Sequence, residues 1–366
     1  MADYTVLNQQ GLTFGGLSKQ YGDFFVPSFE VKVGGNKIGD GIDMVIASVS
    51  VDTSLEKADT CSFTVTNAFD IESREFKWLD QYLTIGKEVQ IDMGYKDKLG
   101  TVFHGYITSV RYELSSWDQT SIVVSGMDYS FKLMKGIKSK VFSKVKDSDV
   151  ASQVISSAGL TAKVDTTTIV HDMIQQVGIS DYQFLSWLAD RNGYEFFVSG
   201  KNVHFRKMHQ NKSPSVTLTW AQNLISLYKE DDLNDQAGVV KVRSWDYKTK
   251  QVLTGQASAI SKVDSGQDGK TVLGNVLGTV EDNYMSEART QAQADAEATA
   301  IQSSKAMKLV SGEATCIGIP QIRAGQYVQL AGLGSKLNKV YYVISARHNI
   351  DESGYTTTLT IGGNVV

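Results

Sequence analysis

The chain is poor in proline and cysteine and has no long hydrophobic run. It contains three prolines in 366 residues, whereas average proteins contain about 5%, and the abundance of Gly, Ser, Thr and Val indicates a β-rich composition with glycine turns. No run of about 18 apolar residues is present, which excludes a membrane-spanning helix. The two cysteines, Cys61 and Cys316, lie in alternating, strand-like contexts. We predict that both are small core residues in a reducing compartment.

An excess of positive charge is also missing. The formal net charge is −4, so a strongly basic face that would grip nucleic acid is not expected, and no motif for sequence-specific nucleic-acid binding is present. The segment 132–146 holds six lysines and no acidic residue, and we interpret it as a solvated loop and strand edge. The first residues lack a basic region and an apolar core, so we expect no signal peptide.

Residues with catalytic or metal-binding chemistry are scattered along the sequence. None of the five histidines forms a metal-binding motif with another histidine or with a cysteine. The histidines are His104, His171, His204, His209 and His348. Neither a G-x-S-x-G nucleophile elbow nor a Cys/His protease signature occurs. We therefore predict a protein that is not an enzyme, with no catalytic, metal-binding or cofactor-binding residue, and the interface residues remain unassigned.

Two acidic segments half-match functional motifs. In the loop 264–271, an EF-hand would need oxygen ligands where Gly266 and Asn275 stand, and a P-loop would need a glycine where Asp264 stands. We interpret this loop as a polar turn. Asp231, Asp232 and Asp235 could suggest general acid–base chemistry, but they follow a strand in a polar run, and we interpret them as a solvated loop.

The N-terminal third is rich in strand patterns. Residues 1–28 form a glycine-spotted, aromatic arm without a clear period, and we expect it to be irregular. Alternating segments punctuated by Gly, Asn and Asp then predict a small antiparallel β-barrel over 29–135, interrupted by a short helix at 75–82. The predicted strands are 29–33, 44–54, 61–68, 88–95, 101–114 and 120–129.

The middle region, 136–210, combines helices with a hairpin. Asp147 or Ser148 is expected to cap a helix that Gly159 ends. A second helix begins at Ser180 or Asp181 and ends at Gly193, and its apolar face contains Phe184, Leu185, Trp187 and Leu188. Strands 194–198 and 203–207 follow as a β-hairpin.

The last two regions are a β-rich stretch at 211–280 and a helix with closing strands at 281–366. Strands are predicted at 215–220, 223–231, 238–247, 250–257, 339–350 and 354–363. The helix predicted at 283–308 is rich in alanine, whose small side chain permits close approach to another backbone but buries little area. It fits against a sheet or a partner subunit, or it is a solvated surface helix.

Three stretches together resemble the phage late control protein D family, the baseplate hub proteins of contractile tails that are related to the hub part of VgrG proteins. The first is G-K-E-V-Q-I-D-M-G-Y at 86–95 followed by V-F-H-G-Y-I-T at 102–108. The second is the helix and hairpin at 180–207. The third comprises P-Q-I-R-A-G-Q-Y-V at 320–328, Y-V-I-S-A-R-H at 342–348 and G-Y-T-T-T at 354–358. The three stretches occur in the family's order.

The resemblance implies a β-rich α+β fold with two related antiparallel β-barrel domains and inserted helical elements. It also implies a homotrimeric hub at the base of the tail tube, adapting a hexameric tube to a trimeric spike, in the baseplate of a phage tail or injection particle assembled in the bacterial cytoplasm. The implied partners are the tail tube protein, a spike protein and baseplate wedge proteins, with the tape-measure protein as a further candidate. Because the chain ends at Val366 without a spike extension, we expect the spike to be a separate protein.

Two other functions remain open at this stage. A tail-associated enzyme that cleaves glycans would use two carboxylates from separate strands, about 5–10 Å apart in a groove. A receptor-binding or adhesin β-protein would form an oligomer without affinity for tube or spike proteins. The sequence alone does not distinguish a phage from another injection system.

Overall fold

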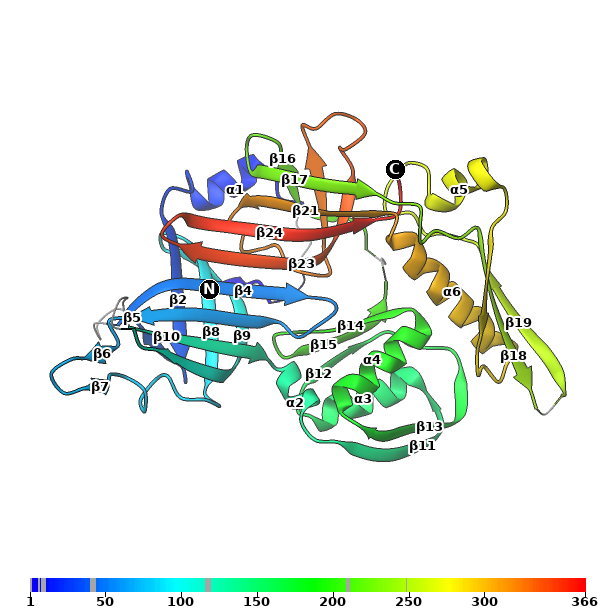
Figure 1. Cartoon of the computed structure of the whole chain (residues 1–366), viewed down its shortest axis with the longest axis horizontal. Coiled ribbons are helices and arrows are strands. Elements are labelled where there is room, and N and C mark those ends of the chain that lie inside the picture. The colour runs from blue at the N-terminus through cyan, green and yellow to red at the C-terminus, as the bar shows by residue number, and fades with distance from the viewer. Residues whose placement is uncertain are drawn as a thin grey trace.

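The computed structural model describes residues 2–5, 7, 11–39, 44–115, 120–208, 211–247 and 249–366. Strands dominate it, and the largest sheet has 14 strands (Figure 1). Helices are concentrated in two insertions on one side of this sheet. The predicted class, a β-rich α+β fold with two related antiparallel β units, is confirmed.

The two units, which we call the first and second repeats, each contain six main strands. The first repeat comprises β2 (Pro27–Val33), β4 (Val45–Ser54), β5 (Thr60–Thr66), β8 (Glu88–Tyr95), β9 (Lys98–Glu113) and β10 (Ser121–Asp128). The second comprises β16 (Pro214–Thr219), β17 (Leu224–Asp231), β21 (Val310–Ile317), β22 (Tyr327–Ala331), β23 (Val340–Asp351) and β24 (Gly354–Gly363). The sequence predicted ten of these twelve strands as explicit segments.

The strands of both repeats follow the same spatial order. The first repeat runs β4-β5-β10-β9-β8-β2, and the second runs β17-β21-β24-β23-β22-β16. Each neighbouring pair is antiparallel in both repeats, except that β16 is parallel to β22. The chain therefore contains the same strand order twice, with the direction of one edge strand reversed.

Bulges and turn geometry extend the equivalence to single residues. The register of the first two strands shifts at Ala47 in β4 and at Ile225 in β17. The third pairing in each repeat, β10 with β9 and β24 with β23, shifts at Thr108 in β9 and at Ile344 in β23. Because a bulge adds one residue to one strand and redirects its side chains, two bulges at matching places fix the residue-by-residue correspondence of the repeats.

A glycine before the fourth strand in chain order has the same role in both repeats. Gly86 and Gly325 both have φ of 85°, a conformation that glycine adopts without steric cost. The Gly86 N–H donates to the Ile107 carbonyl at 2.7 Å, and the Gly325 N–H donates to the Val343 carbonyl at 2.9 Å. In each repeat the partner's N–H donates back to the residue after the glycine, at 2.9 Å.

Strand β23 joins the repeats into one sheet. Its C-terminal half pairs antiparallel with β4, so that β17, β21, β24, β23, β4, β5 and β10 follow one another from top to bottom in Figure 1. One hydrophobic core runs through both repeats and includes Val51 and Phe63 of the first and Val343 and Leu359 of the second. The two units are therefore not independently packed barrels.

The middle insertion has its own hydrophobic core. It comprises α2 (Ser130–Met134), β11 (Lys138–Lys146), α3 (Asp147–Ser157), β12 (Thr161–Val164), β13 (Val170–Ile179), α4 (Asp181–Asn192), β14 (Tyr194–Ser199) and β15 (Asn202–Lys207). Ser180 forms the predicted cap of α4, in a reciprocal capping box with Gln183, and Gly193 ends the helix in a left-handed conformation. Lys146, not Asp147 or Ser148, occupies the N-cap of α3.

The second insertion lies between β17 and β21. It comprises β18 (Val239–Asp246), β19 (Gln251–Ala257), α5 (Gly269–Leu277), β20 (Glu281–Met285) and α6 (Gln291–Met307). Ala294, Ala298 and Ala306 are buried along one face of α6. A Cβ added at Gly255 of β19 would lie 2.1 Å from the Ala294 backbone, so the alanine-rich helix packs closely on a sheet, one of its predicted arrangements.

Besides the N-cap of α3, two further expectations for local structure are wrong. The arm expected to be irregular contains, besides β1 (Ala2–Asp3), the helix α1 (Phe14–Tyr21), which is capped by Thr13 and buries Leu17 and Tyr21 in the shared core. Its two glycines and aromatic residues concealed the helical period. The helix expected at 75–82 is absent from these described residues: β6 (Phe69–Asp70) and β7 (Glu75–Phe76) form a small hairpin followed by turns. The remaining strand, β3 (Asn36–Ile38), pairs with β2.

Candidate functional site

The described histidines are held by structural contacts. His348 is buried in β23, with Nε2 at 2.8 Å from the Ile322 carbonyl oxygen and Nδ1 at 3.0 Å from the Tyr355 hydroxyl. Burial lowers the pKa of His348 to about 4 and that of His204, which stacks on Phe197, to about 3. Both imidazoles are neutral at pH 7 and serve packing.

The other described histidines do not form a cation site either. His104 lies beside Tyr129, with Nε2 at 3.2 Å from its hydroxyl, and burial lowers the His104 pKa. His209 lies outside the described residues. Within the described ranges, no group of three or more His, Cys, Asp or Glu side chains could hold a metal ion. The free cysteines Cys61 and Cys316 are both buried, as predicted.

One Asp–His pair links α3 to β13 and was not recognised in the sequence. His171 Nε2 lies 3.2 Å from Asp147 Oδ2, while Gln293 of α6 lies 3.0 Å from Nδ1. Although burial opposes ionisation of Asp147, hydrogen bonds from His171, Arg191 and Asn192 lower its pKa. Because both imidazole nitrogens have partners and neither partner is a hydroxyl or a thiol, the pair ties α3, β13, α4 and α6 together and has no nucleophile to activate.

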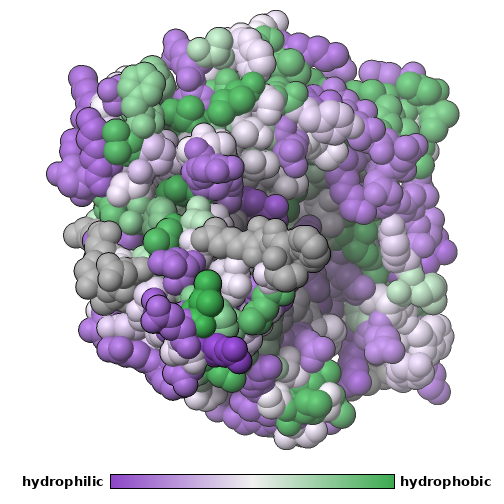
Figure 2. Space-filling view, turned by 60° about the vertical axis from the view of Figure 1, so that its left-hand side comes forward, coloured by the Kyte–Doolittle hydropathy of each residue, from purple (hydrophilic) through white to green (hydrophobic). Residues whose placement is uncertain are grey.

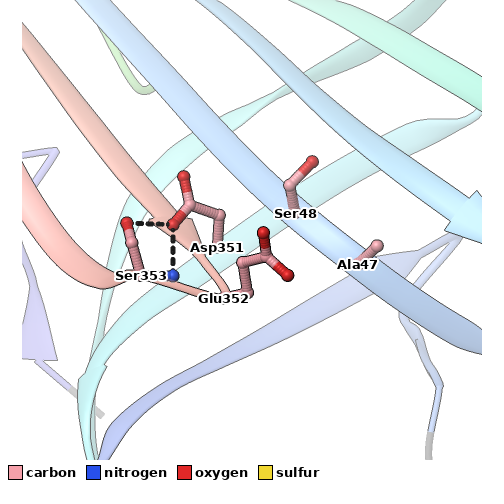
Figure 3. Close-up of a pocket in the computed structure, with 5 residues that line it drawn as sticks. All are labelled: Ala47, Ser48, Asp351, Glu352 and Ser353. Carbon is pink, nitrogen blue, oxygen red and sulfur yellow. Dashed lines mark hydrogen bonds between the residues drawn. The ribbon is translucent and has the colours of Figure 1, made fainter.

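An open hollow lies at the turn between β23 and β24. It is lined by Ala47, Ser48, Asp351, Glu352 and Ser353 (Figure 3). The Ser353 N–H donates to Asp351 Oδ1 at 2.8 Å, and hydrogen bonds from Ser353 lower the Asp351 pKa. A carboxyl that is ionised more readily than usual cannot act as the general acid of a glycosidase. This hollow therefore gives no support to the enzyme hypothesis.

The acidic segments singled out in the sequence also have structural partners. Asp231 and Asp235 form ion pairs with Lys229 and Lys308. In the loop 264–271, Asp268 accepts a 2.8 Å hydrogen bond from the Thr271 N–H and caps α5. The interpretation of this loop as a polar turn agrees with the structure, which adds a short helix after the turn.

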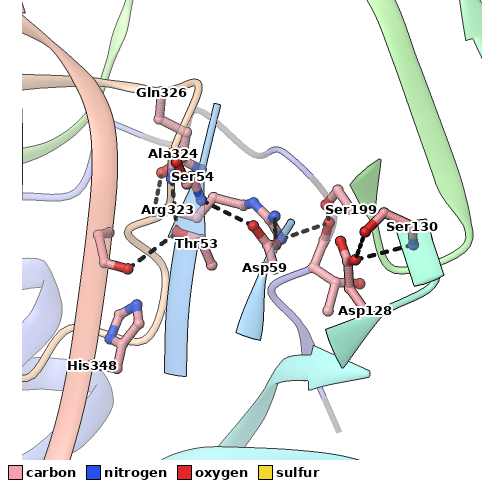
Figure 4. Close-up of polar contacts among 12 residues, drawn as sticks. Thr53, Ser54, Asp59, Asp128, Ser130, Ser199, Arg323, Ala324, Gln326 and His348 are labelled. Atoms are coloured by element: carbon pink, nitrogen blue, oxygen red, sulfur yellow. Dashed lines mark hydrogen bonds and ion pairs between the residues drawn. The ribbon is translucent and has the colours of Figure 1, made fainter. Parts of the chain in front are cut away.

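A buried polar cluster lies where the two repeats and the middle insertion meet (Figure 4). Arg323, in the β21–β22 connection of the second repeat, forms a 2.7 Å ion pair with Asp59, in the β4–β5 turn of the first. Its guanidinium also donates to the Thr5 carbonyl oxygen at 3.2 Å, and the Ser199 hydroxyl of β14 donates to the same oxygen. The N-terminal segment, both repeats and the middle insertion therefore share one network.

Burial shifts the acids of this junction. It raises the pKa of Asp59 to about 6, even though Arg323 opposes the shift. Burial and the nearby charge of Asp59 raise the pKa of Asp128 to about 8. Asp128 Oδ1 accepts a 3.0 Å hydrogen bond from the Ser130 N–H, whereas its Oδ2 has no partner among the described groups. The sequence offered one clue to this junction, which is that Arg323 is the single charged residue in the segment 318–328.

Two strand edges are without a strand partner in the described part of the chain. On the face in Figure 2, hydrophobic side chains occur in separate groups among hydrophilic ones. Strand β17 pairs only with β21 among the described strands, so its other edge has no strand partner there. Residues 109–113 of β9 pair on one edge with β10 and have no ladder partner on the other in the described part of the chain. Unpaired edges of this kind can accept a strand from another chain.

Two other surface expectations have different outcomes. The lysines of segment 132–146 lie on α2, on β11 and in the turn between them, and Lys140 is 4.8 Å from the Phe142 ring centre. Trp187, which we expected in the core of the middle insertion, is 45% exposed and stacks between Phe184 and Arg191. The four apolar positions of α4 span a wider arc of the helix surface than the core covers, so Trp187 remains partly exposed.

Comparison with known proteins identifies the family and the fold. A family model described as the Alg8 N-terminal domain matches residues 25–352. The chain belongs to this family. No curated protein sequence matches the chain. The description of this family names no activity.

Solved structures of tail proteins have the same fold. The chain is similar to the 43 kDa tail protein of prophage MuSo2 from Shewanella oneidensis, with 16% identity, a TM-score of 0.70, and coverage of 92% of this chain and 98% of that one. For a tail protein from Neisseria meningitidis the values are 13%, 0.70, 92% and 97%. For an E. coli component of the type VI secretion system, described as structurally similar to the T4 tail proteins gp27 and gp5, they are 10%, 0.57, 91% and 76%.

These comparisons establish a fold found in phage and type VI secretion tail proteins. They agree with the general part of the family resemblance, which is a tail-protein fold. The more specific assignment to hub proteins is a proposal. In the described part of the chain, no helix has the length and apolar character needed to cross a membrane.

Proposed function

We propose that the chain is a structural hub protein at the base of the tail tube of a contractile phage tail or injection system. Three copies would form a ring that adapts the hexameric tube to a trimeric spike. The observation that carries this proposal is the presence of the same order of six strands twice in one chain, with matching bulges. Three such chains present six similar units while keeping threefold symmetry.

The likeness in fold to tail proteins supports the same role. The proposed partners are the tube protein on the sixfold side, a spike protein on the threefold side, and baseplate wedge and tape-measure proteins around the ring. The proposed location is the tail baseplate, after assembly in the bacterial cytoplasm. The proposed role is architectural and needs no catalysis. It is supported by the hydrogen bonds and ion pairs that hold His348, His171 and Asp59 in structural contacts.

Cryo-electron microscopy of the assembled particle tests this proposal. We expect three copies in one ring, with first and second repeats alternating opposite six tube subunits. Six copies in the ring, or three copies of which only one repeat faces the tube, would contradict the adaptor role. A glycan-hydrolysis assay with purified bacterial cell wall tests the enzyme alternative, and we expect no cleavage above that of a buffer control.

A further inference from the structure

The contact between β4 and β23 shows how one repeat joins the next within the chain. Six residue pairs connect the strands, from Ser54 opposite Ser345 to Val49 opposite Ile350. Arg347 stands opposite Asp52, and its Nε lies 2.6 Å from Asp52 Oδ1. This joint combines a backbone ladder with one ion pair on its solvent side.

The correspondence between the repeats assigns an equivalent to each strand of this joint. Asp52 of β4 lies opposite Thr60 of β5, and Glu230 of β17 lies opposite Ser311 of β21, at the same distance beyond the bulge. Arg347 of β23 pairs with β24, and Arg111 of β9 pairs with β10, three residues after the bulge in each case. Therefore β17 is the counterpart of β4, and residues 109–114 are the counterpart of 345–350.

The edges of β17 and β9 that correspond to the joined edges of β4 and β23 are both unpaired in the described part of the chain. The edge of β17 that corresponds to the β23-facing edge of β4 has no strand partner among the described residues, and neither does the edge of β9 at 109–113. Large side chains are exposed along them: Tyr112 is 47% exposed, Leu114 60% and Tyr228 64%. In the described part of the chain, these two counterpart edges are therefore left without a strand partner.

We infer that β17 of one copy pairs antiparallel with residues 109–114 of a neighbouring copy, in the register of the β4–β23 joint. This inference rests on the proposed function and names the surfaces that would close the ring. Each of three chains would contribute one internal joint and one joint between copies, so that six similar joints alternate around the ring.

The side chains that this register brings together are complementary. Arg111 falls opposite Glu230, as Arg347 falls opposite Asp52. Leu114 falls opposite Leu227, as Ile350 falls opposite Val49. No pair of like charges is opposed in the six positions; the remaining pairs are Ser109 with Asp232, Val110 with Asp231, Tyr112 with Lys229 and Glu113 with Tyr228.

In the single chain these charged groups have only weak local contacts. Arg111 forms a 2.9 Å ion pair with Glu113 on its own strand, with side chains 67% and 49% exposed. Glu230 accepts a 3.4 Å hydrogen bond from the Tyr228 hydroxyl. Exposed pairs of this kind contribute little stability, so both groups can exchange their present contacts for a partner across the joint.

Cysteine cross-linking tests the register. In the full chain, oxidation of the double variant Arg111→Cys/Glu230→Cys at high protein concentration should link two and then three copies, with no larger species. The variant Asp52→Cys/Arg347→Cys is the positive control, because it should form a disulfide within one chain. The variant Arg111→Cys/Tyr228→Cys displaces one partner by two residues and should link copies much less. The native cysteines are buried and serve as a background measured in the unsubstituted protein.

The outcomes separate this inference from the proposed function. A trimer in sedimentation that does not link at 111 and 230 overturns the strand pairing but leaves the threefold hub intact. Linked chains longer than three copies support the pairing but contradict the closed threefold ring, since a heterologous contact that does not close forms a filament. Single copies without cross-links at all concentrations overturn the pairing.

Charge exchange tests the ion pair in the same assembly. Arg111→Glu and Glu230→Arg each place like charges opposite one another, and each should weaken association at least about tenfold at low salt. The double variant Arg111→Glu/Glu230→Arg restores opposite charges and should recover most of the loss. If both single variants associate as the unsubstituted protein does, or if the double variant is weaker than both, the predicted pairing is wrong.

Discussion

The two repeats have the same strand order but differ in what surrounds it. In the second repeat, the connection between β21 and β22 is short and buried, and its Arg323 reaches across to Asp59. In the first repeat, the connection between β5 and β8 is longer and carries the β6–β7 hairpin, whose Phe76 packs on Tyr112 of β9 at 5.3 Å. One connection fixes the internal joint, whereas the other lies beside an open edge.

The repeated strand order therefore presents two equivalent pairs of strand edges, of which the described chain joins one, β4 with β23. The internal joint is reinforced by a buried ion pair that the open edges lack. Buried charges lose much stability when one partner is removed, while exposed pairs lose little. Substitutions at equivalent or paired positions can therefore measure how far the two repeats have diverged.

The largest expected effect concerns the buried junction. Arg323→Met leaves Asp59 without its charged partner, and we expect the free energy of unfolding at pH 7.5 to fall by about 3–5 kcal/mol. The matched control is Arg347→Met, which removes the exposed partner of Asp52 and should cost less than about 1 kcal/mol. Urea denaturation followed by circular dichroism measures both values.

The pH dependence of this difference provides a second check. Because burial raises the Asp59 pKa to about 6, Asp59 in the Arg323→Met variant should be protonated at pH 5, and the loss should then be smaller. An equal loss at pH 5 and pH 7.5 would contradict the assignment of the effect to an unpaired carboxylate.

The equivalent glycines offer a direct comparison between the repeats. Gly86→Ala introduces a Cβ at positive φ with no atom within 4 Å, and should cost about 1–2 kcal/mol. Gly325→Ala meets Arg206, Leu55 and Phe197 at 3.1–3.3 Å in addition, and should cost about 2–4 kcal/mol. Thermal and urea unfolding of the two variants test this order. Equal losses would mean that the buried connection of the second repeat adjusts freely.

Asp128 should make stability fall as pH rises. Its folded-state pKa is about 8, above the usual value of about 3.9 in an unfolded chain. Between these values the folded state holds a proton that the unfolded state has lost, so the free energy of unfolding declines by up to about 1.4 kcal/mol per pH unit. This contribution is complete at pH values below about 4 and is lost as pH rises through about 8.

The measurement compares Asp128→Asn with the unsubstituted protein between pH 7 and pH 8. Asp59, with a pKa of about 6, and His348, with a pKa of about 4, are outside this window. Removing the titrating carboxyl should flatten the slope, while Asp80→Asn at an exposed position should not change it. A variant that keeps the original slope would show that Asp128 is ionised at neutral pH.

Sequence patterns predicted the strands better than the contacts between them. The alternation in β9 and β23, and the turn between β23 and β24, identified the elements because a strand's period is local. The pairing of β23 with β4 and the ion pair of Arg323 with Asp59 join residues nearly 300 and 264 positions apart. No local pattern records such a contact. The equivalence of the repeats became visible only from strand order and bulges.

Trp187 should have a small effect on stability, in contrast to its buried neighbours on α4. The indole is 45% exposed, with the Arg191 guanidinium 4.3 Å from the ring centre and the Phe184 ring at 6.1 Å. Trp187→Ala should therefore cost about 1 kcal/mol through loss of partial burial and cation–π contact. Leu188→Ala removes a fully buried side chain one residue later and should cost about 2–5 kcal/mol. Equal losses in urea unfolding would indicate that Trp187 contributes to the core as much as Leu188 does. Unchanged stability together with weaker association in sedimentation would indicate that Trp187 lies at an interface between copies.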